Sequence, residues 1–137
     1  MVITALDRLP HREPFRFVSD LQELEPQRRG VGEWRVVGDE GFFKGHFPGN
    51  PIVPCVLLAE ALSQLAGLVA FAGSEEAAAG RLAQVNVKFL SAVIPPASIR
   101  LKAVLVKEMS GLYLFEGEAS VGGILVANGT LVLARAS

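Results

Sequence analysis

The stretch "PCVLLAEALSQLAGLVAFA" (residues 54–72) is the most apolar segment of the chain and decides which fold we expect. A proline opens it and Gly73 follows it, an order typical of the start and the end of an α-helix. A helix that is apolar on nearly all sides lies inside a protein or a membrane. Because Glu60, Ser63 and Gln64 fall in its first half and no basic flank follows, the sequence favours a buried helix over a membrane-spanning one.

The segments on both sides of this helix predict β-strands. Before it, residues 15–25 and 30–38 have the pattern of a hairpin. After it comes a polar, alanine-rich connection at 73–81. Four runs with period-two alternation or short apolar blocks follow, divided by glycine-containing turns. These runs span residues 82–90, 98–109, 112–121 and 124–134.

The run at 112–121 has one apolar and one polar face. The apolar face carries Tyr113, Phe115, Ala119 and Val121, and the polar face carries Glu116, Glu118 and Ser120. This pattern is typical of an antiparallel sheet with one covered face. In chain order, the elements are two strands, a loop, one long helix and several further strands. We therefore expect an α+β protein in which a curved antiparallel sheet wraps around one long central helix.

The composition bounds the size and the class of the protein. A chain of 137 residues suits one domain. Hydrophobic residues make up 50% and charged residues 20%, a balance typical of globular proteins. The 13 basic and 14 acidic residues give a formal net charge of -1, which excludes a global attraction to nucleic acid or to an anionic membrane. The apolar content exceeds what one small core needs, so we expect burial between subunits.

Two further features indicate a cytoplasmic location. Cys55 is the only cysteine, so the chain cannot form an internal disulfide, and a reducing compartment is the simpler expectation. The N-terminal sequence "MVITALDRLPHREP" has acidic residues and prolines where a signal peptide needs an apolar block. Nothing in it predicts export.

Glu60 is the least expected residue of the helix. An ionised carboxylate in an apolar segment loses its hydration unless it is paired or reaches water. Exposure at the surface or a pair with an arginine would each explain it. Ser63 and Gln64 lie three and four positions further on, so the three side chains form one polar stripe. Such a stripe favours a substrate pocket, or polar groups of a partner, beside the helix.

His46 lies in a loop rich in glycine and proline that precedes the helix. Alone, a single histidine is equally well explained by a structural role. Its ring is nevertheless able to accept a proton near neutral pH, and a stiff loop would position it as a base. Metal binding by His11, His46 and Glu60 is the alternative, but these residues lack the spacing of known zinc motifs, so we expect no metal. For His11 we expect a structural role.

Three motifs resemble a known family: "LPHREPF" (9–15), "GHFPGNPIVP" (45–54) and "LLAEALSQLAG" (57–67). They are similar to those of the (3R)-hydroxyacyl-acyl carrier protein dehydratases of bacterial fatty-acid synthesis. A fourth segment, "VNVKFLSAVIPP" (85–96), extends the resemblance over most of the chain. The resemblance implies a single hot-dog domain over residues 1–137. It also implies dehydration of 3-hydroxyacyl thioesters to trans-2-enoyl thioesters, without a cofactor.

The resemblance also implies roles for individual residues. His46 would remove the C2 proton and Glu60 would protonate the departing 3-hydroxyl group. Gln64 would orient Glu60. In the substrate-binding part of the site, Phe47 and Gly49 would shape the pocket, and the backbone amides of Cys55 and Val56 would bind the thioester carbonyl. Those two amides are the first free donors of the helix, because Pro54 has no N–H group.

The sequence departs from the family at two positions. Cys55 stands where the family usually has glycine, which keeps the amide but adds a side chain beside the thioester path. Helix N-termini also favour the thiolate form of cysteine, so a nucleophilic role for Cys55 is an alternative. Glu13 stands where tyrosine is common, and we expect it to change the pocket rim or a subunit contact.

The implied partners are a second copy of the chain and an acyl carrier protein. In the family, His and Glu of one active site come from two subunits of a dimer, and trimers of dimers also occur. Candidate contacts for the acidic carrier protein are Arg81, Lys88, Arg100 and Lys102. Two alternatives stay open from the sequence. One is a hot-dog thioesterase that uses Glu60 to activate water, and the other is a non-catalytic acyl-binding subunit.

Overall fold

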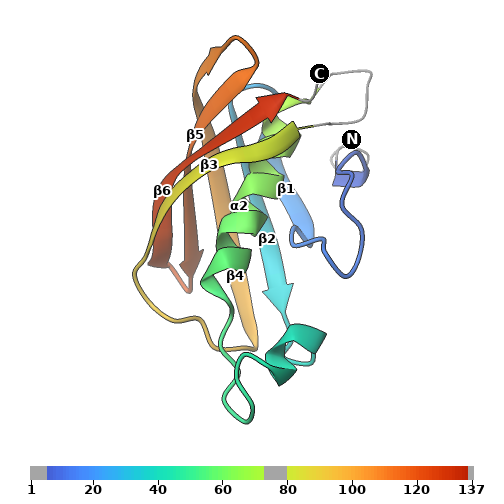
Figure 1. Cartoon of the computed structure of the whole chain (residues 1–137), viewed down its shortest axis with the longest axis vertical. Helices are drawn as coiled ribbons and strands as arrows, with labels where there is room; N and C mark the ends of the chain where they lie inside the picture. Colours follow the sequence, from blue (N-terminus) through green and yellow to red (C-terminus); the bar gives the residue numbers. More distant parts are fainter. Residues whose placement is uncertain (1–5, 73–79, 136–137) are drawn as a thin grey trace.

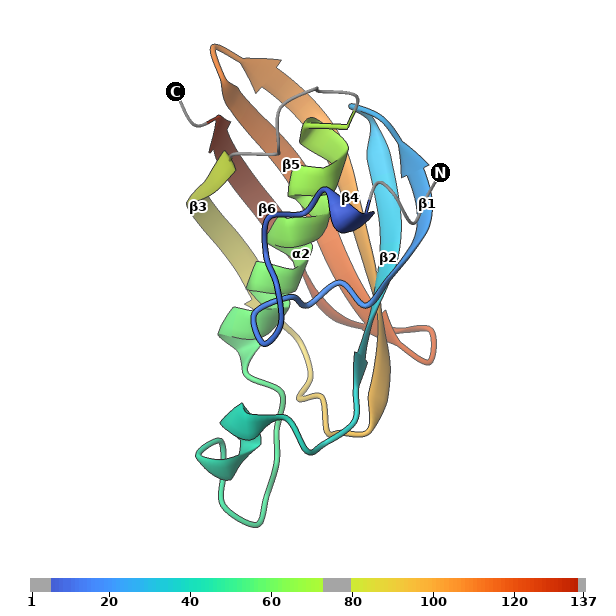
Figure 2. The same ribbon diagram turned by 90° about the vertical axis from the view of Figure 1, so that its right-hand side faces the viewer.

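The computed structural model describes residues 6–72 and 80–135 of the chain. The elements in chain order are β1 (Asp20–Glu25), β2 (Arg29–Val36), the 3-10 helix η1 (Gly41–Lys44), α2 (Cys55–Ala70), β3 (Gly80–Phe89), β4 (Ala97–Met109), β5 (Leu112–Val121) and β6 (Ile124–Arg135). The six strands form one antiparallel sheet in the order β1-β2-β4-β5-β6-β3. The sheet curves around α2 (Figures 1 and 2). This arrangement confirms the predicted fold class.

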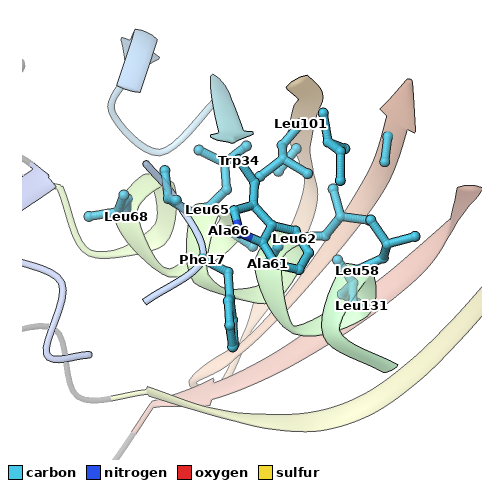
Figure 3. Close-up of a cluster of buried hydrophobic side chains, with 14 of the residues drawn as sticks. Phe17, Trp34, Leu58, Ala61, Leu62, Leu65, Ala66, Leu68, Leu101 and Leu131 are labelled. Carbon is cyan, nitrogen blue, oxygen red and sulfur yellow. The ribbon is translucent and has the colours of Figure 1, made fainter. Parts of the chain in front are cut away.

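The core lies between α2 and the concave face of the sheet. Leu62 and Leu65 of α2 are fully buried (Figure 3). Phe115 of β5 is fully buried as well. Burying one such side chain contributes about 1.5–3 kcal/mol, so this layer holds the helix in the sheet. The predicted alternation in β5 is present: its apolar positions point to the helix and Glu116 and Glu118 are exposed. In the part of the chain described, no helix is long and apolar enough to span a bilayer.

The helix boundaries lie close to those predicted. Pro54 has extended backbone angles and acts as the N-cap, so the first helical residue is Cys55. The helix ends at Ala70, two residues before the predicted end, and the amide of Phe71 still donates to the carbonyl of Gly67. The proposed stop at Gly73 lies outside the described residues. So does most of the predicted 73–81 connection, of which only residues 80 and 81 are described, in β3.

The first strand begins at Asp20, not at Phe15 as the pattern predicted. The reason is that the backbone of Phe15 and Phe17 pairs with a side chain of the helix. The amide of Phe17 donates to Gln64 Oε1 at 2.9 Å, and Gln64 Nε2 donates to the carbonyl of Phe15 at 3.0 Å. Residues 15–17 are thus held beside α2 by a helix side chain, and the amide of Ser19 is the first to donate to β2, at the carbonyl of Glu33.

β3 lies at the edge of the described sheet, where it pairs with β6 and approaches it closely at Gly129. A Cβ atom at Gly129 would overlap the carbonyl oxygen of Asn86 and would lie 2.6 Å from the Cα atom of Val87. Both are backbone atoms, so β3 itself would have to move. Only glycine lets the two strands pair at this point.

We expect Gly129→Ala to lower the free energy of unfolding by about 1–3 kcal/mol, the usual cost of overpacking. Urea unfolding of both proteins at one fixed protein concentration measures the difference. Gly41→Ala is the matched control, because a Cβ atom there would meet nothing within 4 Å. Equal effects of the two substitutions would contradict the close-contact explanation.

Candidate active site

The loop that carries His46 is held in place at both ends. At its start, Glu40 accepts hydrogen bonds from the amides of Val37 at 3.0 Å and Gly38 at 2.8 Å. Burial opposes ionisation of Glu40, but these amide donors outweigh it and lower the pKa of the carboxyl group. At the far end, the amide of Val53 donates to the carbonyl of Val93 at 2.8 Å, which ties the loop to the segment before β4.

His46 itself is fixed by two contacts with Ile52. Its carbonyl accepts from the Ile52 amide at 3.1 Å, and its ring Nδ1 lies 2.8 Å from the Ile52 carbonyl oxygen. A carbonyl oxygen only accepts, so Nδ1 must carry the hydrogen. The neutral ring therefore keeps the lone pair of Nε2 free to accept a proton. The ring also stacks on Phe47, with 4.1 Å between the centroids.

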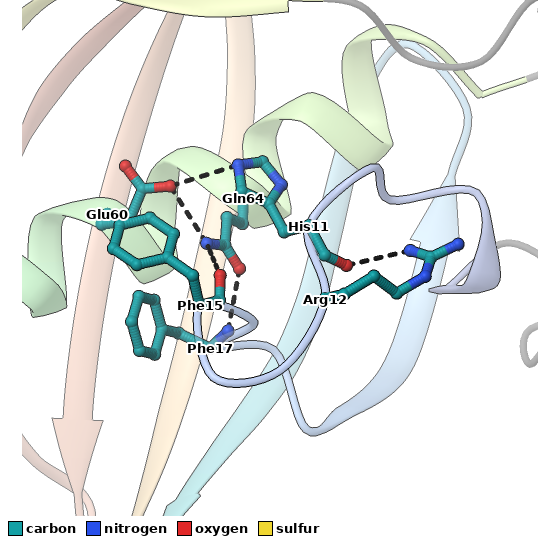
Figure 4. Close-up of polar contacts among 6 residues, drawn as sticks. All are labelled: His11, Arg12, Phe15, Phe17, Glu60 and Gln64. Atoms are coloured by element: carbon teal, nitrogen blue, oxygen red, sulfur yellow. Dashed lines mark hydrogen bonds and ion pairs between the residues drawn. The ribbon is translucent and has the colours of Figure 1, made fainter. Parts of the chain in front are cut away.

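Glu60 lies in the first half of α2, and its side chain is 21% exposed. Gln64, one helical turn further on, donates from Nε2 to Glu60 Oε2 at 3.0 Å (Figure 4). On the same side, Nε2 of His11 lies 3.5 Å from Glu60 Oε2. The carboxylate thus faces Gln64 and His11 with one oxygen.

These polar groups line a pocket of about 300 Å³. The helix contributes the predicted polar stripe of Glu60, Ser63 and Gln64. The N-terminal segment contributes His11 and Phe15, and β3 contributes Arg81. Apolar walls come from β3 and β6, through Leu82 and Leu133. A small pocket with an apolar lining and few polar groups at one side suits an acyl ligand with a polar head.

The other predicted site residues lie outside this pocket. Among the described residues, no hydrogen bond or ion pair joins His46 to Glu60, and His46 does not line the Glu60 pocket. The four remaining substrate-binding residues are exposed: Phe47, Gly49, Cys55 and Val56. Cys55 and Val56 form the start of α2, where no side-chain hydrogen bond caps the helix. One chain therefore carries Glu60 in a pocket and His46 in a loop outside it.

For two residues of the pocket, the sequence predicted roles other than lining the site. His11 was expected to be structural, and Arg81 was one of four general candidates for a carrier-protein contact. Glu13 does not line the Glu60 pocket and instead lines a different one, beside Arg16 and Phe42. Within residues 6–72 and 80–135, no group of three His, Cys, Asp or Glu side chains is placed to hold a metal ion.

A curved antiparallel sheet around one long helix defines a protein of the hot-dog fold. Solved structures agree. The dehydratase heterocomplex ApeI:P from Xenorhabdus doucetiae matches 96% of this chain and 91% of that chain, with a TM-score of 0.80 at 21% identity. A hypothetical thioesterase with coenzyme A from Streptococcus pneumoniae matches 86% of this chain and 85% of that chain, with a TM-score of 0.69 at 14% identity.

The chain belongs to the FabA-like family, because the model of the FabA-like domain matches residues 9–130. Among curated relatives, the 3-hydroxyacyl-(acyl-carrier-protein) dehydratase FabZ of Moorella thermoacetica is 42% identical over 130 residues, covering 92% of this chain and 90% of that protein. The protein of the same name from Geotalea uraniireducens is 36% identical over 127 residues, covering 90% of this chain and 88% of that protein.

Replacing Gln64 with leucine should disturb the site and the fold together. The side chain is 1% exposed, and its loss would leave the Phe17 amide and the Phe15 carbonyl without their partners. Each unpaired buried group costs about 1–3 kcal/mol. We expect a lower free energy of unfolding in urea. Ser63→Ala, on the same stripe, is the control, and an equally large loss there would contradict a special role of the Gln64 amide.

Proposed function

We propose that this protein is a 3-hydroxyacyl-acyl carrier protein dehydratase of fatty-acid biosynthesis, formed by a single domain over residues 1–137 and working in the cytoplasm. Its curated relatives carry this activity in their names and match most of the chain. The observation that carries the proposal is the hydrogen bond from His46 Nδ1 to the Ile52 carbonyl, which leaves Nε2 as a base. The hydrogen-bonded carboxyl group of Glu60 would supply the acid.

In the first step, His46 Nε2 takes the proton from C2 of the 3-hydroxyacyl thioester. The C–H electron pair moves toward the carbonyl, whose oxygen gains negative charge. The amide of Cys55, at the open start of α2, would donate to this oxygen. The exposed Cys55 side chain stands next to that position and would influence which acyl groups fit.

In the second step, the C2–C3 double bond forms and the C3–O bond breaks. Glu60 gives its proton to the leaving hydroxyl group, which departs as water. His46 then carries one extra proton and Glu60 carries one fewer, and exchange with solvent restores both. Phe47 and Gly49 would shape the entrance next to the base, whereas Gln64 keeps the carboxyl group oriented.

We propose that a complete site needs two chains, with His46 from one and Glu60 from the other. Supporting this, the two residues have no contact within the described part of one chain. The edge strand β3 and the residue after it expose Val85, Phe89 and Leu90, of which Leu90 is 54% exposed. Phe47 and Val56, near the proposed base and carbonyl site, are also exposed, at 47% and 74%. A symmetric dimer would bury such surfaces. Association of three such dimers into a trimer of dimers would be a further step of assembly.

The carrier protein would approach the Glu60 pocket. Arg81 is the candidate best placed for it, because it lines that pocket. Lys88 and Lys102 instead line a hollow that also includes Glu116 and Glu118. Their positive charge is therefore partly offset. An acidic carrier protein would gain most from Arg81, by charge complementarity.

The two alternative functions predict different outcomes in an assay with acyl thioester. A hot-dog thioesterase would release free thiol without an enoyl intermediate; the Streptococcus pneumoniae structure is described as a hypothetical thioesterase. A non-catalytic acyl-binding subunit would bind thioester without turnover, and substitution of His46 would leave that binding unchanged. No contact of the described residues favours either alternative over dehydration.

We expect the purified protein to form the enoyl thioester, seen by its ultraviolet absorbance, from 3-hydroxyacyl-acyl carrier protein. His46→Ala and Glu60→Gln should each lower kcat/KM by about 100-fold to 10,000-fold, because each removes one proton transfer. Glu116→Gln, the same chemical change at an exposed carboxylate, is the control. Folded wild-type protein without turnover over several acyl lengths would refute the proposal and make Cys55→Gly the first variant to test.

Mixing the two inactive variants tests the shared site. If subunits exchange at random, half of the dimers contain one chain of each kind, and one of their two sites combines an intact His46 with an intact Glu60. We therefore expect recovery of about a quarter of the wild-type activity. Mixed samples without recovery after verified exchange, or an active monomer on dilution, would contradict the shared site.

A further inference from the structure

We infer that His11 is a positioning residue that decides which oxygen of Glu60 carries the acidic proton. The inference rests on the proposed dehydration and deepens it. His11 lies in the N-terminal segment, 49 positions from Glu60 in the chain, yet its ring reaches the same pocket (Figure 4). Nε2 of the ring and Oε2 of the carboxyl group are 3.5 Å apart.

The surroundings of the ring select its tautomer. Nδ1 of His11 is buried and has no hydrogen-bond partner, whereas Nε2 faces the carboxyl oxygen. Hydrogen on Nδ1 would leave a buried donor without an acceptor and would aim the Nε2 lone pair at an oxygen. Hydrogen on Nε2 avoids both penalties. The neutral ring therefore points an N–H group at Glu60 Oε2.

Glu60 Oε2 then faces two donors, while no donor is recorded at Oε1 among the described residues. Gln64 Nε2 donates to Oε2 at 3.0 Å, and His11 approaches the same oxygen from the N-terminal segment. An oxygen that accepts one N–H group and faces a second at 3.5 Å is a poor place for a proton. The acidic proton of Glu60 is therefore held on Oε1. When the proton leaves, the two donors stabilise the charge that remains on the carboxylate.

A purely structural role for His11 makes the opposite demands on the side chain. The ring stacks on Phe15, with centroids 6.2 Å apart, and this stack could hold the segment against α2. A structural role needs the ring and its volume, whereas positioning needs the N–H group near Oε2. Three substitutions separate these demands. His11→Gln keeps a donor at similar reach without a ring, His11→Met has similar length without a donor, and His11→Phe keeps a ring without a donor.

The experiment measures kcat and KM for these three variants with 3-hydroxyacyl-acyl carrier protein. We expect His11→Met and His11→Phe to lose kcat by about 10-fold to 100-fold with little change in KM, because misorientation of a catalytic group acts on the chemical step. His11→Gln should stay near wild type. A His11→Phe variant as active as wild type would overturn the inference, and so would equal losses in His11→Gln and His11→Met.

The Glu60→Gln background supplies a second test. If His11 acts through the carboxyl group, His11→Met should cause no further loss of kcat in that background. The same fold-loss with and without Glu60 would overturn the inference. Size-exclusion chromatography and thermal unfolding identify any variant that is misfolded. If either His11→Met or His11→Phe is misfolded, the other one is compared with His11→Gln. Absence of dehydration by wild type would instead refute the proposed function itself.

Discussion

The buried amide of Gln64 connects the backbone of the N-terminal segment to the candidate catalytic carboxyl group. Its oxygen accepts from the Phe17 amide, and its nitrogen donates to the Phe15 carbonyl and to Glu60. An exchange of the amide oxygen and nitrogen would put donor against donor at Phe17, so only one orientation satisfies all three groups. Because the amide is almost fully buried, losing this match is costly. The position of His11 beside Glu60 follows from the same bonds.

The sequence predicted the elements that local periodicity determines. The helix was found from its long apolar run and the proline that opens it, and the strands after it were found from period-two alternation or short apolar runs. The start of the stretch at 15–25 was wrongly assigned to a strand, since Phe15 and Phe17 pair with a side chain 47 to 49 positions away and not with a neighbouring strand. The 3-10 helix η1 was not predicted either. Its four residues are too few to show a period, and its cap, Glu40, makes no side-chain bond to it.

The site was predictable to the extent that it depends on short motifs. His46, Glu60 and Gln64 were selected from their spacing and from the family resemblance, and their catalytic roles stay predictions. The approach of His11 to Glu60 could not be predicted, because it depends on the path of residues 9–15 across α2. The motif "LPHREPF" was the available signal, but composition gives no reason to prefer a polar contact over packing at His11. The orphaned Nδ1 atom becomes visible only in three dimensions.

The interface of the proposed dimer would both complete the active site and bury exposed apolar side chains. Glu60 and His46 lie on separate elements of the chain. The edge strand β3, which lines the Glu60 pocket through Arg81 and Leu82, leaves apolar side chains exposed further along. In a twofold interface the same surface of both subunits meets, so completing one site completes the other. Burial of Val85 and Phe89 would then provide association energy for an arrangement that also brings His46 to Glu60. Activity in such a protein is tied to association, and it falls with dilution together with the stability that the interface provides.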